Sequence, residues 1–246
     1  MYISGNTILI TGATSGIGHA LACEFIREGN TVIICGRRSE RLAAIKAKHP
    51  AIVTKECDIS ITEQREELCT WALQNYPELN ILINNAGIQL ATNLSVPVDL
   101  TTIRLEVETN FIAPLHLASL FAGHLKTQDH AAIINISSGL AFVPIASMPV
   151  YCATKAAIHS LTISLRHQLR HTTIKVFEIA PPSVDTELGH QHREDTTQSH
   201  GGIPIQEFIT EAMEAIKNDT LEAAIGQAKG LHAKREELFD NMNQNR

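Results

Sequence analysis

One stretch decides the fold: residues 6–18, which read NTILITGATSGIG. It begins as an apolar, β-branched run, which is typical of a buried strand, and it ends in a segment with helical spacing. A glycine-rich turn between a strand and a helix lets backbone N–H groups approach a phosphate at the positive end of the helix. The spacing Gly-x-x-x-Gly-x-Gly therefore predicts a nucleotide site, with a purely structural tight turn as the alternative. The residues expected around the phosphates are Gly12, Thr14, Ser15, Gly16, Ile17 and Gly18.

The strand–helix alternation continues along the chain. Apolar runs predict further strands at 31–35, 52–57, 80–84, 131–137 and 173–180. Helical spacing predicts helices at 17–28, from Ser39, and at 62–76, 101–126, 149–170, 204–217 and 227–243. Runs that are apolar throughout are typical of strands buried on both faces of a parallel sheet. We therefore expect an α/β fold, a Rossmann-type doubly wound parallel sheet with helices on both faces.

The overall composition excludes several classes of protein. With 246 residues and 44% hydrophobic content, the chain is long enough for one substantial core, and we expect a single domain over residues 1–246. A net charge of −6 without a basic cluster argues against nucleic-acid and anionic-membrane partners. The N-terminus lacks the features of a secretory signal. We expect a cytoplasmic protein whose five cysteines are reduced thiols.

The end of the second predicted strand indicates which dinucleotide is bound. Residues 33–38 read IICGRR, with two arginines and no acid. In this fold an acid at that position binds the ribose 2′-hydroxyl, whereas an arginine accommodates a 2′-phosphate. We therefore predict NADP(H), with Arg37 as the main phosphate contact and Arg38 as its helper; solvated loop charges are the alternative. After the third strand, Asp58 is expected to contact the adenine amino group, with Ile59 beside it.

Tyr151 and Lys155 indicate what is done with the nucleotide. Side chains four residues apart on a helix lie on one face, so the lysine ammonium is expected beside the phenol. Lowering the phenol pKa from about 10 to about 7 requires roughly 4 kcal/mol. One positive charge at about 4 Å supplies about that much at an effective dielectric of about 20. A tyrosine with such a pKa is a general acid/base for a carbonyl/alcohol pair.

Together these motifs resemble the short-chain dehydrogenase/reductase family in its single-domain branch, and most of all its bacterial DltE-type members. Besides the glycine loop, the marks are NNAG at 84–87, Asn110, ISS at 136–138, YCATK at 151–155 and PPSVDT at 181–186. The resemblance implies that Ser138 binds the substrate oxygen and that Tyr151 exchanges the proton. It also implies that Lys155 holds the nicotinamide ribose and that Asn110 holds a relay water. The further cofactor contacts that it implies are Asn85, Ala86, Gly87, Pro181, Val184 and Thr186.

Several of these residues have a structural alternative. Ser138 could close a turn, and Asn110 could be a satisfied core amide. The family usually has glycine where this chain has Pro182, which removes a backbone donor. His159, His167 and His171 are interpreted as surface or interface histidines. The pattern formed by His190, His192 and His200 is interpreted as part of a mobile loop, so no metal site is predicted.

The resulting hypothesis is an NADP(H)-dependent oxidoreductase that acts on a small carbonyl or alcohol substrate. One alternative is a reductase of carrier-protein-linked 3-oxoacyl groups, which would need a basic docking patch near Arg166 and Arg170. The other is a non-catalytic NADP(H)-binding sensor or scaffold. Residues 187–202 are expected to form a mobile substrate loop. The family resemblance implies a homodimer or homotetramer.

Overall fold

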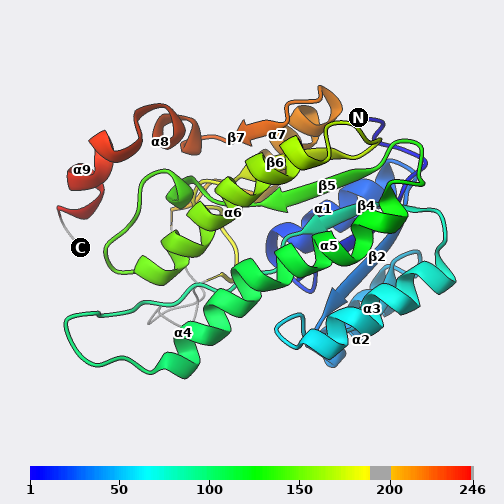
Figure 1. Cartoon of the computed structure of the whole chain (residues 1–246), viewed down its shortest axis with the longest axis horizontal. Coiled ribbons are helices and arrows are strands. Elements are labelled where there is room, and N and C mark those ends of the chain that lie inside the picture. Colours follow the sequence, from blue (N-terminus) through cyan, green and yellow to red (C-terminus); the bar gives the residue numbers. More distant parts are fainter. Residues whose placement is uncertain (189–200, 245–246) are drawn as a thin grey trace.

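The computed structural model describes residues 1–188 and 201–244. Its centre is a seven-stranded parallel sheet in the order β3-β2-β1-β4-β5-β6-β7 (Figure 1). The strands are β1 (Thr7–Thr11), β2 (Thr31–Gly36), β3 (Val53–Glu56), β4 (Leu79–Asn84), β5 (Ala132–Ile136), β6 (Lys175–Ala180) and β7 (Glu222–Ala224). The chain builds outward from β1 to β3, crosses back to β4 and builds to β7. Ligands of such sheets bind at the carboxyl ends of the strands near this reversal, which here lies between β1 and β4.

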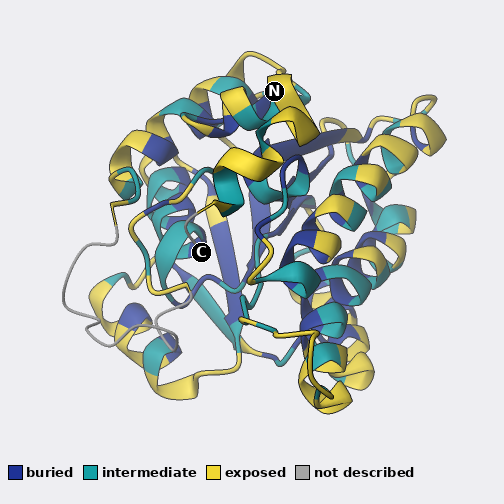
Figure 2. Ribbon diagram, turned by 90° about the vertical axis from the view of Figure 1, so that its left-hand side faces the viewer, coloured by how far each residue is buried: buried dark blue, intermediate teal, exposed yellow. Residues whose placement is uncertain are grey.

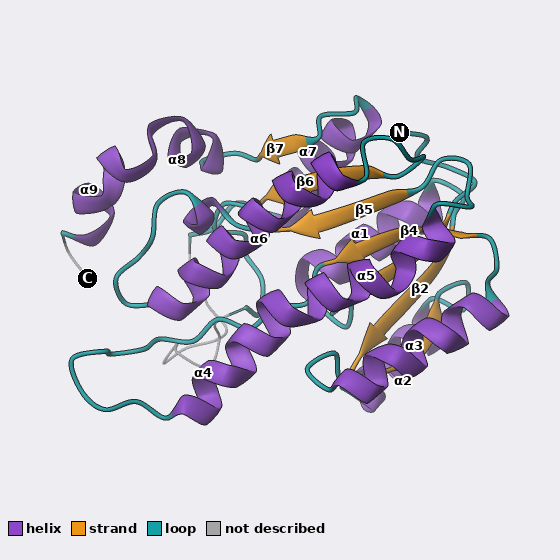
Figure 3. Ribbon diagram, viewed as in Figure 1, coloured by secondary structure: helices purple, strands orange, loops and turns teal. Residues whose placement is uncertain are grey.

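Helices cover both faces of the sheet (Figure 3). One apolar core packs beneath α1 (Gly16–Arg27), α2 (Ser39–Lys48) and α7 (Ile205–Lys217). A second core packs beneath α3 (Thr62–Asn75), α5 (Ala113–Leu125) and α6 (Pro149–Gln168). In Figure 2 the strands are buried between helices whose outer faces are exposed. Helices on both faces of a parallel sheet confirm the predicted doubly wound fold. The largely apolar runs in the sequence follow from this coverage, because most strands are buried on both sides.

The remaining elements differ from the sequence-based expectation. The predicted helix at 101–126 is divided into α4 (Leu100–Val107), a π-helical turn (Glu108–Ile112) and α5. The predicted helix at 227–243 is divided into α8 (Ala228–Lys234), a 3₁₀ turn (Arg235–Leu238) and α9 (Phe239–Asn243), with Arg235 at a φ of 49°. Strand β7 was not predicted, because the short run Glu-Ala-Ala has no β-branched residue. It forms by pairing with the edge of β6.

The predicted substrate loop lies largely outside the described residues, which omit 189–200. The described chain on either side is joined by a parallel bridge between Val184 and Ile203. All five cysteines are free thiols, four of them buried. Among the described helices, none combines the length and apolar character that a membrane crossing requires.

Candidate active site

The glycine loop has the shape of a phosphate site. Gly12 and Gly16 have φ values of 65° and 56°, a region that favours glycine. A Cβ on Gly12 would stand 2.5 Å from the Cα of Ala86, so a side chain is excluded there. Ser15 occupies the N-cap of α1 without a side-chain cap bond. Its side chain therefore leaves the first N–H groups of the helix to another acceptor, which is the arrangement of anion sites at helix N-termini.

The loop after β4 is bound tightly to the glycine loop. The Thr11 hydroxyl accepts hydrogen bonds from the backbone N–H groups of Asn85 and Ala86, both at 3.1 Å. The Asn85 amide nitrogen donates to the Thr11 carbonyl at 2.9 Å. A Cβ on Gly18 would stand 2.4 Å from that amide nitrogen, so only glycine permits this approach. The structure thus places Asn85 and Ala86 against the glycine loop, and it places Gly87 beside Lys155, whose Nζ would lie 3.6 Å from a Cβ on Gly87.

The two arginines after β2 have different surroundings. Arg38 Nη2 donates to the hydroxyls of Thr14 at 2.6 Å and Ser15 at 2.9 Å, so its guanidinium lies on the glycine loop. Arg37 is more exposed, and its Nη1 lies 3.9 Å from Asp58 Oδ2. Arg38, which was expected to be the helper, is therefore the arginine held at the glycine loop.

A third arginine and an acid complete this charged group. Arg41 Nη1 donates to Glu187 Oε2 at 2.5 Å, and Arg38 Nη1 lies 3.5 Å from the same oxygen. Burial alone would raise the pKa of Glu187, but the hydrogen bond and charge of Arg41 and the charge of Arg38 lower it. Arg41 was not among the predicted site residues, and Glu187 was predicted only as the first residue of the substrate loop. Arg41 follows Arg38 by three residues at the start of α2, a spacing that places both on one helix face and could have revealed it.

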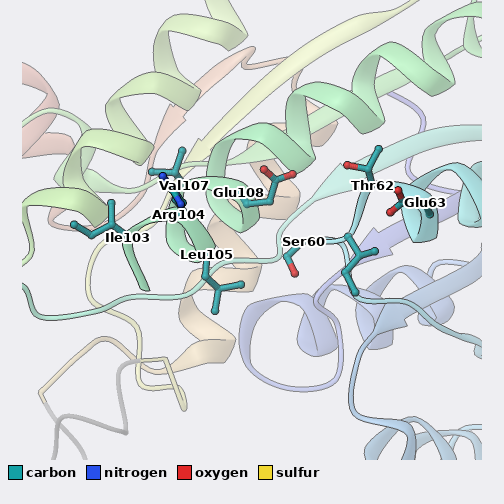
Figure 4. Close-up of a pocket in the computed structure, with 9 residues that line it drawn as sticks. Ser60, Thr62, Glu63, Ile103, Arg104, Leu105, Val107 and Glu108 are labelled. Carbon is teal, nitrogen blue, oxygen red and sulfur yellow. The ribbon is translucent and has the colours of Figure 1, made fainter. Parts of the chain in front are cut away.

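Asp58 and Ile59 lie beyond the end of β3. Asp58 Oδ1 accepts from the backbone N–H of Ser60 at 2.9 Å and from its hydroxyl at 2.7 Å. Ile59 is buried. Just beyond them, a surface pocket of about 650 Å³ opens between the start of α3 and helix α4 (Figure 4). None of its lining residues belongs to the predicted catalytic group.

Ser138, Tyr151 and Lys155 converge in the interior. Ser138 follows β5, Tyr151 and Lys155 lie on α6, and all three are buried. The Ser138 hydroxyl accepts from the N–H of Leu140 at 3.1 Å and also hydrogen-bonds the Tyr151 phenol. Lys155 Nζ lies 5.6 Å from the centre of the Tyr151 ring and donates to the carbonyl of Ile136 at 3.0 Å. The structure thus places the predicted serine, tyrosine and lysine side by side.

The electrostatics of this group differ from the expectation. Burial raises the pKa of Tyr151, and the hydrogen bond with Ser138 offsets only part of this effect. The predicted lowering by Lys155 is therefore wrong for this state of the protein, because desolvation of the phenolate dominates. Burial also lowers the pKa of Lys155 to about 8, against the opposing influence of the negative charge of Glu178.

Asn110 lies in the π-helical turn and is buried. Its Oδ1 accepts from the N–H of Ile88 at 2.8 Å. Its Nδ2 donates to the Ile88 carbonyl at 2.8 Å and to the Thr154 hydroxyl at 3.2 Å. These three bonds leave one acceptor position of the amide for a water molecule. Asn110 therefore serves as a core amide that links the chain after β4 to α6. Its part in a proton relay stays a prediction.

The segment after β6 returns to the same site. The carbonyl of Pro181 accepts from the N–H of Gly139 at 2.8 Å, and Val184 is buried. Thr186 lies against the start of α1, since a Cβ on Gly16 would stand 3.5 Å from the Thr186 Cβ. Pro181 therefore borders the Ser138 turn, and Thr186 borders the glycine loop.

The comparisons with known proteins agree with this geometry. The family model for short chain dehydrogenases matches residues 6–197. The protein named "uncharacterized oxidoreductase DltE" of Bacillus subtilis is 45% identical over 248 residues, which cover 99% of this chain and 98% of the relative. The chain therefore belongs to the short-chain dehydrogenase/reductase family of oxidoreductases, as its motifs indicated.

Solved structures show the same fold with either nicotinamide cofactor. A short chain dehydrogenase from Burkholderia cenocepacia, solved with NADP, is 27% identical with a TM-score of 0.82 over 95% of this chain and 94% of that one. A relative from Burkholderia phymatum, solved with NAD, has a TM-score of 0.85 over 99% and 97% at 22% identity, and it supports the fold alone. A nicotinamide cofactor is thus supported at the level of the family.

Proposed function

We propose that the protein is an NADP(H)-dependent oxidoreductase that transfers hydride between the cofactor and a small carbonyl or alcohol substrate. The observation that carries the proposal is the buried group of Ser138, Tyr151 and Lys155, whose ammonium lies next to Gly87 in the loop after β4. A hydrogen-bonded hydroxyl pair next to a buried cation is suited to bind a carbonyl oxygen and to supply its proton.

The residues present fit the dinucleotide. The backbone at Gly12 and Gly16 and the start of α1 would hold the pyrophosphate, and Arg38 would take the 2′-phosphate. When bound, NADPH supplies the hydride, while the protein positions the substrate and manages the proton. The side chains of Thr186 and Lys155 border the same space and would complete the cofactor contacts.

Tyr151 is in the protonated form that carbonyl reduction requires. A phenol whose pKa is raised keeps its proton at neutral pH and is ready to donate it. Ser138 would hydrogen-bond the same substrate oxygen, where negative charge develops. The Lys155 ammonium, with a pKa of about 8, remains largely charged at pH 7 and stabilises the negative charge that Tyr151 acquires.

Replacing Tyr151 by Phe tests the chemistry. The variant should lose NADPH oxidation with a panel of aldehydes and ketones, whereas NADPH binding, followed by fluorescence, should be largely kept. Ser137→Ala is a matched control, since Ser137 is buried nearby but has no assigned role in catalysis. Turnover retained by Tyr151→Phe would contradict the mechanism. Tight NADPH binding without any turnover by the unmodified protein would favour the sensor or scaffold alternative.

Cofactor choice is tested with the two arginines. Charge-assisted hydrogen bonds to a phosphate contribute about 1.5–3 kcal/mol, so Arg38→Ala should weaken NADPH binding by roughly 10- to 150-fold. Arg37→Ala should weaken it by less, because Arg37 lies farther from the glycine loop. NADH binding should be the same in both variants. Equal affinity of the unmodified protein for NADPH and NADH would mean that neither arginine binds the 2′-phosphate.

The carrier-protein alternative called for a basic docking patch near Arg166 and Arg170. Arg166 is one of the two residues considered for it, but its guanidinium donates to the carbonyls of Val176 and Leu221. We retain a single domain, a cytoplasmic location and a homodimer or homotetramer as proposals.

A further inference from the structure

Three metal-binding side chains meet at the β7 edge of the sheet. They are His159 on α6, Glu178 on β6 and Glu222 on β7, elements that lie side by side in Figure 3. Each offers one ligand atom, and these atoms lie within 4.8 Å of one another. The strand register places Glu178 directly beside Glu222, so the closeness of the two carboxylates follows from the sheet itself. Two carboxylates on neighbouring strands repel each other unless a cation lies between them.

Glu178 is the unusual member of this group. Its side chain is completely buried, and its Oε2 lies 2.7 Å from His159 Nδ1. Its second oxygen, Oε1, is also buried and has no hydrogen-bond partner among the described residues. Burying a carboxylate is costly unless its oxygens are paired or coordinate a metal. The packing therefore leaves one buried carboxylate oxygen of Glu178 available to a cation.

The surroundings orient the ligands in the way that metal sites require. His232 Nε2 lies 2.8 Å from Glu222 Oε1, which fixes that carboxylate. The ring of Phe142 packs edge-on against two imidazoles. Its ring centre lies 5.0 Å from that of His159 and 4.7 Å from that of His232. Ligating carboxylates and imidazoles are commonly held by such outer contacts. Glu222 and His232 are partly exposed, so this end of the group borders solvent.

We propose that His159, Glu178 and Glu222 form a binding site for one divalent transition-metal ion of the zinc class. Imidazole and carboxylate ligands suit such ions, and three protein ligands leave a position for water. Two cations lie near these carboxylates: Arg166, whose Nη1 lies 3.9 Å from Glu222 Oε2, and the buried Lys155 ammonium, which interacts electrostatically with Glu178. Nothing in the family's hydride-transfer chemistry needs this ion, and the site ties the edge strand β7 to α6.

The required movements are small. Ligands bound to a tetrahedral zinc at about 2.0–2.1 Å lie roughly 3.3 Å apart. The imidazole of His159 and the carboxylate of Glu178 would therefore separate slightly from their present 2.7 Å, while Glu222 would move inward. Rotation of side chains provides such shifts without a change in the sheet.

A second group of potential ligands serves as an internal control. His19, Cys23 and His49 also lie close enough to hold an ion, but all three are only partly buried. In that group His19 Nε2 and Cys23 Sγ are 3.7 Å apart. A thiolate ligand gives cobalt an intense charge-transfer band in the near ultraviolet, whereas imidazole and carboxylate ligands do not. Cobalt absorption therefore distinguishes the two groups.

The experiment uses full-length, untagged protein that has been dialysed against EDTA. Titration with Co²⁺, followed by visible absorption and by displacement with Zn²⁺, should show one equivalent bound without a thiolate band. Glu178→Gln, which nearly conserves volume, should weaken binding at least about 100-fold, and Cys23→Ser should leave it unchanged. If Glu178→Gln does not fold, the partly exposed Glu222→Gln provides the same test. Three outcomes would overturn the proposal: no Co²⁺ or Zn²⁺ bound, binding kept in both glutamine variants, or binding that Cys23→Ser abolishes.

Discussion

Lys155→Met should make the cofactor-free protein more stable while it removes activity. Burial lowers the pKa of Lys155 from 10.5 to about 8. At about 1.4 kcal/mol per pKa unit, keeping this ammonium charged costs the folded protein about 3 kcal/mol at pH 7. Methionine fits the space of the stem, but it leaves the carbonyl of Ile136 without its donor, at a cost of about 1 kcal/mol. We therefore expect a net gain of about 1–3 kcal/mol.

The gain should depend on pH with a definite sign. Below about pH 8 both the folded and the unfolded protein hold the Lys155 proton, so the full cost is present. Between about pH 8 and 10.5 the unfolded chain binds more protons than the folded one, and the stability contributed by this group rises. Lys155→Met has no such group. The advantage of the variant should therefore shrink as the pH rises through this window.

The assay is urea unfolding of both proteins without cofactor at pH 7, 8, 9 and 10. The difference in free energy of unfolding between variant and parent isolates Lys155 from other titrating groups. NADPH oxidation, measured in parallel, should be lost in the variant. A variant less stable than its parent at pH 7, or a difference that stays constant with pH, would refute the reasoning. Either result would mean that Glu178 already compensates for the buried ammonium.

Two further substitutions test the packing. Gly12→Ala should lower stability by about 1–2 kcal/mol through its φ of 65°, and by about 1–3 kcal/mol more through contact with Ala86. Gly29 has a φ of 82° and open space around it, so Gly29→Ala should show only the loss that comes from φ. Equal falls in melting temperature for Gly12→Ala and Gly29→Ala would contradict the expected clash with Ala86. Arg65→Met should cost about 2–4 kcal/mol, because it leaves the Glu108 carboxylate without the guanidinium that now lies 2.8 Å away. Adding Glu108→Gln should recover part of this loss in chemical unfolding, and full additivity would argue against the ion pair.

Features that depend on neighbours in the chain could be predicted. The strand–turn–helix of the glycine loop rests on residues 6–18, and the facing of Tyr151 and Lys155 rests on one helical turn. Mainly apolar runs identified six of the seven strands, because burial on both faces favours such runs; the edge strand β3, with the sequence VTKE, is only partly buried. The exception, β7, has no signal of its own and exists because β6 offers it an edge.

The tertiary structure decided what depends on distant parts of the chain. Arg38 rather than Arg37 reaches the glycine loop, a choice of side-chain direction that adjacent arginines do not reveal. The pKa of Tyr151 rises because the fold removes the phenol from water, which a helical spacing alone does not state.

The sequence alone was enough to indicate the family, the order of six of the seven strands and the residues that meet at the candidate active site. Only the fold brought together His159, Glu178 and Glu222, which lie on a helix and two strands and carry no motif. The physical reason is range: backbone periodicity acts over a few residues, whereas burial, charge and strand register act between segments that become neighbours only on folding.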